Sequence, residues 1–126
     1  MQSPQTFADS YVALWNETDA ETRRRGIAAL FAPDGQHHVG ARHVSGYAAL
    51  EERVVGSHIK NVQDGGNRFR AVPGAKALQD AVTFFWEMVP CDDDKVLATG
   101  LEFLILDDAG RILTDYQFIL DQPPAA

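Results

Sequence analysis

The stretch that decides the fold runs over residues 95–120 and reads KVLATGLEFLILDDAGRILTDYQFIL. Two runs rich in β-branched, leucine and aromatic residues, Lys95–Leu106 and Arg111–Leu120, lie on either side of residues 107–110, DDAG. Runs of this kind around a short polar loop predict a β-hairpin, and the glycine suits a position with a positive φ angle. We therefore expect two adjacent antiparallel strands near the end of the chain.

A two-residue alternation of side chains begins upstream of this hairpin, near Asn67. Arg68–Val72 alternates and stops at Pro73-Gly74, and Ala81–Val89 alternates over a longer run before a polar turn. Before Asn67 the apolar residues recur every three or four positions instead, which is the period of an amphipathic helix. The change of period predicts helices in the first half of the chain and a sheet in the second.

Three helices are predicted, near residues 4–16, 19–31 and 46–60. The first begins at Ser3-Pro4, where a hydroxyl can cap the free amides and the proline ring needs no N–H. The second follows Thr18–Glu21, which matches a capping box. Both helix starts are therefore marked in the sequence.

The connections also carry turn signals. Pro33-Asp34-Gly35 is expected to stop the second helix and turn the chain into a short strand over Gln36–Val39. Ser45 is expected to cap the third helix, Gly65-Gly66 to mark its exit, and Pro123-Pro124 to begin a loose tail. Helices followed by long antiparallel strands predict an α+β fold with the helices packed on one face of the sheet. A chain of 126 residues with 45% apolar residues is interpreted as one domain, residues 1–126.

The composition argues against several classes of function. The net charge is −7, and the longest basic run, Arg23-Arg24-Arg25, is interpreted as the solvated face of a helix, so nucleic-acid binding is disfavoured. No apolar stretch approaches the roughly 20 residues needed to cross a bilayer. Met1–Pro4 lacks the layout of a signal peptide, and Cys91 is the only cysteine, so a cytoplasmic protein without a membrane partner is expected.

Three stretches resemble SnoaL-like polyketide cyclases and ketosteroid isomerases of the nuclear-transport-factor-2-like superfamily. They are residues 11–16 (YVALWN), 29–35 (ALFAPDG) and 107–112 (DDAGRI), and the order of elements is similar over nearly the whole chain. The resemblance implies a bent, cone-like antiparallel sheet whose concave face is covered by the three helices. An apolar pocket is expected between the sheet and the helices.

The resemblance also implies roles for individual residues. In ketosteroid isomerases a tyrosine on the first helix and a protonated acid on a late strand bind the enolate oxygen, and an aspartate moves the proton. Tyr11 and Glu102 match the first two positions, whereas Val39 stands where the aspartate is expected. His37 shares a strand face with Val39 and is the candidate general base, with a hydrogen-bonded rim histidine as the alternative. SnoaL-like cyclases use an acid on a late strand, so Asp115 is a second candidate acid, although polar alternation on an exposed strand face explains it equally.

Strand alternation places Glu102 beside the small residues Ala98 and Gly100, which leaves room for a ligand, and an apolar setting would raise its pKa. Alternatively, Glu102 lies on the open face or pairs with Arg68 or Arg70. The pocket is expected to contain Trp15, Val39, Val54, Phe84, Trp86, Gly100 and Leu104.

The expected function is a pocket for a small apolar or aromatic carbonyl compound, with acid–base isomerisation, cyclisation or dehydration and without a cofactor. A metal is not expected, because the four histidines lack ligand-type spacing. A ligand carrier without turnover is one alternative, since the proton-moving aspartate is missing. An interaction module is another, because Tyr116, Phe118 and Leu120 can form an apolar outer face, and a homodimer is expected through that face.

Overall fold

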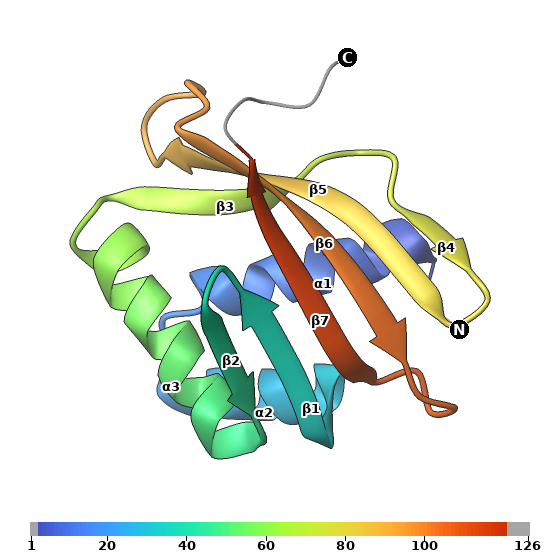
Figure 1. Ribbon diagram of the computed structural model, residues 1–126. Helices are drawn as coiled ribbons and strands as arrows, with labels where there is room; N and C mark the ends of the chain where they lie inside the picture. Colours follow the sequence, from blue (N-terminus) through green and yellow to red (C-terminus); the bar gives the residue numbers. More distant parts are fainter. Residues whose placement is uncertain (1–2, 121–126) are drawn as a thin grey trace.

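The computed structural model describes residues 3–120, which form three α-helices and one curved seven-stranded sheet (Figure 1). The expected tail at Pro123-Pro124 lies outside the described residues. The helices are α1 (Pro4–Asn16), α2 (Ala20–Leu30) and α3 (Tyr47–Ser57), and α3 continues into the π-helical segment η1 (His58–Gln63). The strands are β1 (Phe31–Val39), β2 (Arg42–Ser45), β3 (Asn67–Ala71), β4 (Lys76–Leu78), β5 (Ala81–Pro90), β6 (Ala98–Leu106) and β7 (Ile112–Leu120).

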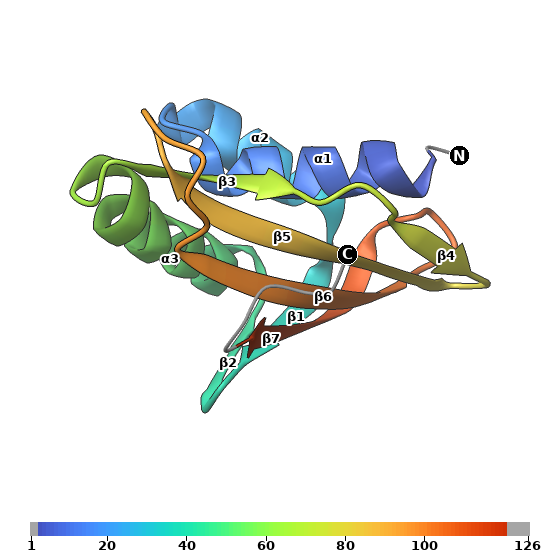
Figure 2. The same cartoon turned by 90° about the horizontal axis from the view of Figure 1, so that it is seen from above.

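The α+β fold is confirmed, and the sheet has the strand order β2-β1-β7-β6-β5-β3, with β4 paired to β5. Figure 2 shows α1 and α2 lying along one side of the curved sheet. Every strand pair is antiparallel except β1 with β7, which run parallel. The sheet is therefore mixed rather than wholly antiparallel, and the parallel pair joins strands that are far apart in the sequence.

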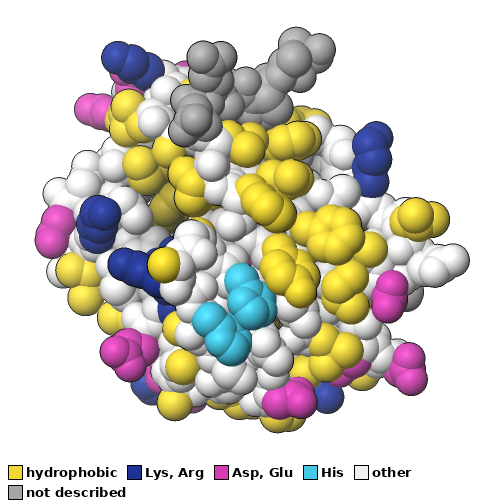
Figure 3. Space-filling model, in the orientation of Figure 1, with side chains coloured by type: hydrophobic (Ala, Val, Ile, Leu, Met, Phe, Trp, Pro, Cys, Tyr) yellow, Lys and Arg dark blue, Asp and Glu magenta, His cyan; other side chains and the backbone are white. Residues whose placement is uncertain are grey.

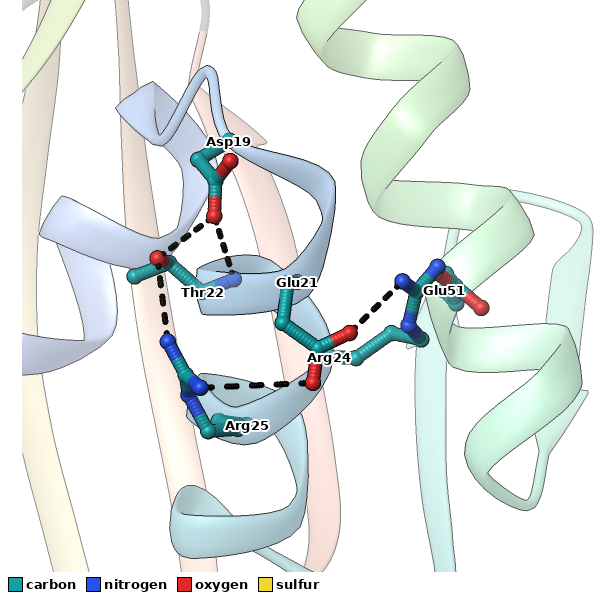
Figure 4. Close-up of polar contacts among 6 residues, drawn as sticks. All are labelled: Asp19, Glu21, Thr22, Arg24, Arg25 and Glu51. Carbon is teal, nitrogen blue, oxygen red and sulfur yellow. Dashed lines mark hydrogen bonds and ion pairs between the residues drawn. The ribbon is translucent and has the colours of Figure 1, made fainter.

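The helix starts follow the expected chemistry with one correction. Ser3 caps α1 by accepting a hydrogen bond from the Thr6 amide at 3.1 Å. For α2 the cap is Asp19 rather than Thr18, and its carboxylate accepts from the Thr22 amide at 2.8 Å (Figure 4). An aspartate at this position reaches the third amide of the helix, and its negative charge also suits the positive end of the helix dipole.

The arginine triplet on α2 is only partly solvated. Arg24 is exposed and pairs with Glu21 at 2.8 Å and with Glu51 of α3 at 3.3 Å (Figure 4). Arg23, in contrast, is buried and donates a hydrogen bond to the backbone carbonyl of Glu17 at 2.8 Å. The expectation that the whole triplet forms a solvated face is therefore wrong for Arg23, whose guanidinium group holds the loop between α1 and α2.

The segment between α2 and α3 differs most from expectation. Residues 33–35 lie inside β1, where the pairing with β7 shifts between Phe31 and Gln36, instead of forming a turn before the strand. A proline is tolerated at such an irregular position because it removes no regular ladder bond there. Ser45 belongs to β2, and α3 is preceded by Gly46 at a φ of 86°, with no side-chain cap.

The hydrophobic core lies between the helices and the inner face of the sheet. Tyr11 of α1 packs edge-on against Phe84 of β5, with the ring centroids 5.5 Å apart, and Leu104 and Ile112 are fully buried beneath the helices. Within residues 3–120, no helix combines the length and the apolar character needed to span a membrane. The core ends at a group of buried polar side chains.

Candidate active site

Four polar side chains meet on the inner face of the sheet: Tyr11 from α1, His37 from β1, Glu102 from β6 and Asp115 from β7. None of them is more than 2% exposed. The parallel pairing places His37 directly opposite Asp115, and the antiparallel pairing of β6 with β7 places Asp115 opposite Leu104, one same-face step from Glu102. The apolar stripe of α1 then brings Tyr11 over the strands.

Asp115 is the centre of this group. One of its oxygens, Oδ2, accepts a hydrogen bond from the Tyr11 hydroxyl and another from His37 Nδ1 at 2.8 Å. With an ionised carboxylate as acceptor, the proton of a neutral His37 sits on Nδ1. Asp115 Oδ1 and His37 Nε2 are buried and have no hydrogen-bond partner among the described residues. The partner of Tyr11 is thus a carboxylate.

The two buried acids have opposite pKa shifts. Burial raises the pKa of Glu102 well above its ordinary value, and the negative charge of Asp115 adds to the effect. Burial also acts to raise the pKa of Asp115, but the polar contacts with Glu102, His37 and Tyr11 outweigh it, so the pKa of Asp115 is lowered. Burial, followed by the charges of the two acids, raises the pKa of Tyr11. These shifts favour an ionised Asp115 beside a protonated Glu102 and a protonated Tyr11.

The carboxyl group of Glu102 is held at one oxygen and free at the other. Trp86 Nε1 donates a hydrogen bond to Oε1 at 3.0 Å, whereas Oε2 has no hydrogen-bond partner within residues 3–120. A Cβ atom on Gly100 would lie 2.1 Å from Cζ2 of Trp86, so the glycine lets the indole lie across the strand. The space beside Gly100 is filled by this ring rather than left for a ligand. Arg68 and Arg70 pair with other acids, so neither one neutralises Glu102.

A cavity of about 310 Å³ opens beside these groups, between α1, the α3–η1 helix and the inner face of the sheet. Four of the residues expected at the pocket line it: Tyr11, Trp15, Trp86 and Glu102. Its remaining apolar wall comes mainly from Phe69, Met88, Ala98 and Ile119. The volume lies at the small end of the range for ligand pockets, and an apolar wall with few polar groups is typical of them.

Other residues expected in the pocket lie outside its lining. His37 and Asp115 are buried in the layer behind Tyr11, so they reach the cavity only through other side chains. Val39, Val54, Phe84, Gly100 and Leu104 are also absent from the lining, and of these Val54, Phe84 and Leu104 belong to the core. The reason is that strand alternation gives the face on which a side chain lies but not the helix that covers it.

Sequence reasoning missed the helical wall of the cavity. The residues of this wall are Arg53, Ser57, Lys60 and Asn61. They lie outside the apolar stripe from which the helix is predicted. Their offsets of four, seven and eight residues from Arg53 place them on one helical face. This spacing is the signal that could have found them.

The outer face of the sheet carries a different set of side chains. His38 points away from His37, as alternation predicts, and stacks on His43 at 4.4 Å and on Tyr116 at 5.1 Å. The described residues include no group of three or more His, Cys, Asp and Glu side chains placed to hold a metal ion.

A larger hollow of about 750 Å³ lies between α1, α2 and the loop of the β6–β7 hairpin. None of the four buried polar residues lines it. Size alone would favour this hollow, but the groups with shifted pKa values and free hydrogen-bonding atoms are at the smaller cavity. We therefore place the candidate site at the smaller cavity.

Comparison with solved structures gives similar folds throughout. A proposed isomerase of the SnoaL-like family from Agrobacterium tumefaciens C58 superposes with a TM-score of 0.82 at 22% identity, over 94% of this chain and 99% of that one. A nuclear-transport-factor-2-like protein from Exiguobacterium sp. 255-15 gives a TM-score of 0.70 at 20% identity, over 92% of this chain and 99% of that one. A proposed polyketide cyclase from Sinorhizobium meliloti gives a TM-score of 0.62 at 15% identity, over 89% of this chain and 93% of that one.

A scan against protein-family models and a search of curated proteins give no match. At these identities the solved structures establish the fold and leave the activity open. The chain has the nuclear-transport-factor-2-like fold, and its structure resembles those of SnoaL-like proteins within that superfamily.

Proposed function

We propose that the protein binds a small apolar or aromatic carbonyl compound in the 310 Å³ cavity and donates a hydrogen bond from Glu102 to its carbonyl oxygen. The observation that carries this proposal is the state of the Glu102 carboxyl group. It lines the cavity, Trp86 fixes one oxygen, the other oxygen has no partner, and the raised pKa keeps the group protonated. A neutral carboxylic acid in an apolar site is a strong hydrogen-bond donor to a carbonyl oxygen.

The other buried groups support this donor in the proposal. The charge of Asp115 keeps Glu102 protonated, and His37 holds Asp115 in place through the 2.8 Å hydrogen bond. His37 is therefore assigned a positioning role instead of the general-base role predicted from the sequence.

Proton removal next to the polarised carbonyl is assigned to Tyr11 and Asp115. The Tyr11 oxygen accepts the proton from the ligand carbon while its own proton passes to Asp115 along their hydrogen bond. The electron pair of the broken C–H bond forms the C=C bond of an enolate, whose negatively charged oxygen accepts a hydrogen bond from Glu102. Return of the proton to a different carbon is an isomerisation, and attack of the enolate carbon on a second carbonyl of the same ligand is a cyclisation.

A carrier without turnover is the second candidate, because no ionised carboxylate among residues 3–120 lines the cavity directly. Exchange of the methyl protons of acetophenone in deuterated water, followed by NMR, separates the two functions. An enzyme of the proposed kind speeds the exchange, and both Tyr11→Phe and Asp115→Asn remove that effect. A carrier binds acetophenone, with a change in tryptophan fluorescence, and leaves the exchange rate at that of the buffer.

We also propose that the protein is a homodimer that pairs through the outer face of the sheet. Phe103, Tyr116 and Phe118 are 39%, 42% and 52% exposed on adjacent strands. Figure 3 shows apolar side chains gathered on this face, with histidine side chains beside them. A second copy of the chain offers the same apolar surface, so a two-fold interface would cover the apolar surfaces of both copies.

A further inference from the structure

The helical wall of the cavity is polar and carries positive charge. Arg53, Ser57, Lys60 and Asn61 lie on one face of α3 and η1 and line the cavity from the side of these helices. Glu102 and most of the apolar lining residues belong to the opposite, sheet side. A single small ligand in this cavity would therefore contact an acid and an apolar surface at one side and a cationic group at the other.

Arg53 has no counter-ion among the described residues. Its guanidinium carbon lies 5.1 Å from the centre of the Trp15 ring, in a cation–π contact, and its buried Nε atom has no hydrogen-bond partner. Other arginines of the chain do pair with acids, as Arg24 does with Glu21 and Arg70 with Glu87. A partly buried and unpaired cation is unfavourable unless something supplies the missing negative charge.

The groups that surround Arg53 supply this charge only in part. Burial, followed by the nearby charge of Arg42, lowers the pKa of Arg53 and outweighs the opposing effects of Tyr11, Glu102 and Asp115. Burial favours the neutral forms of Glu102 and Tyr11, and Asp115 is already bound by Tyr11 and His37. The positive charge at this side of the cavity is therefore available to a ligand.

We infer that the ligand carries a carboxylate, which binds Arg53 with Lys60 nearby, while its carbonyl oxygen binds Glu102. The planar fork of a guanidinium group matches the two oxygens of a carboxylate, and the Nε atom of Arg53 has no hydrogen-bond partner among the described residues. The small volume and largely apolar wall suit a compact organic acid. The inference rests on the proposed carbonyl-binding function and adds the charge and chemical class of the ligand.

Tryptophan fluorescence can test the inference directly, because Trp15 and Trp86 are the only two tryptophans of the chain and both line the cavity. The probes are 4-acetylbenzoate and its neutral match, 4-acetylbenzamide. We expect the acid to bind at least about tenfold more tightly than the amide, as for one hydrogen bond to a charged group. Arg53→Met keeps the aliphatic cover of Trp15 and should remove this preference without changing the affinity for the amide. Arg25→Met, on the exposed face of α2, is the matched control and should change neither affinity.

Equal binding of the acid and the amide by the parent protein, or equal weakening of both by Arg53→Met, would overturn the inference. Stronger competition by inorganic phosphate than by benzoate would overturn the choice of a carboxylate. If acetophenone binds in a Glu102-dependent way and the carboxylate adds nothing, only the inference fails. If 4-acetylbenzoate depends on Arg53 but Glu102→Met changes no affinity, the carboxylate site stands and the carbonyl-binding function fails.

Discussion

Replacing Glu102 by glutamine tests the protonation state on which the proposed function depends. The amide oxygen of glutamine can still accept the hydrogen bond from Trp86 Nε1, which is 3.0 Å long in the parent protein. Glutamine also has nearly the same volume and stays neutral at every pH. If Glu102 is neutral in the folded protein, the Glu102→Gln change should cost no more than about 1 kcal/mol at low pH, the worth of one imperfect hydrogen bond.

The pH dependence of stability then shows whether Glu102 is protonated in the folded protein. The pKa of Glu102 is raised in the folded protein, by burial first and by Asp115 second. Below the unfolded value of about 4.3, both states are protonated and the full stability is present. As the pH rises above that value, the unfolded parent chain releases the proton while the folded protein keeps it. The free energy of unfolding therefore falls by up to about 1.4 kcal/mol per pH unit until the folded pKa is passed.

The Glu102→Gln variant has no such loss, so its stability relative to the parent protein should increase as the pH rises from 4 towards neutral. Urea unfolding of both proteins at a series of pH values, followed by circular dichroism, measures this difference. Glu52→Gln, a change of an exposed acid on α3, controls for the loss of one acidic residue. A Glu102→Gln variant that becomes relatively less stable as the pH rises, or that unfolds outright, would show that Glu102 is ionised in a structural pair and would refute the reasoning.

Three further predictions concern the neighbouring groups and the outer face. Asp115→Asn should lower the free energy of unfolding at neutral pH by about 1–3 kcal/mol, because Oδ2 accepts two buried hydrogen bonds. Since the pKa of Asp115 is lowered on folding, this deficit should shrink as the pH falls below about 3.9 and through the folded pKa; a deficit that grows in acid contradicts the assignment. Gly100→Ala should displace the Trp86 ring, cost about 1–3 kcal/mol in thermal or urea unfolding and alter the tryptophan emission; an unmoved ring in a crystal structure of the variant would contradict this. Light scattering at micromolar concentration should give the mass of two chains, and Phe118→Lys should give that of one; a monomeric parent protein rejects the dimer.

Local sequence patterns determined most of the elements. The change from a helical to a two-residue period near Asn67 separates the helices from the main strands, because side-chain spacing follows directly from the local backbone geometry. The same spacing places Glu102 and Asp115 on the face that becomes buried. Gly110 has the positive φ, 81°, that the hairpin loop predicts.

The contacts that make the site depend on the tertiary structure. His37 reaches Asp115 only because β1 pairs parallel with β7, and a local period contains no information about which distant strand becomes the neighbour. The ring of Trp86 fills the space that the sequence left open beside Gly100. Likewise Arg53 has no ion-pair partner among the described residues, and its guanidinium group lies over the ring of Trp15 instead. The sequence determined which side chains face inward, whereas the packing of separate elements decided their partners, because burial and proximity to other charges set each protonation state.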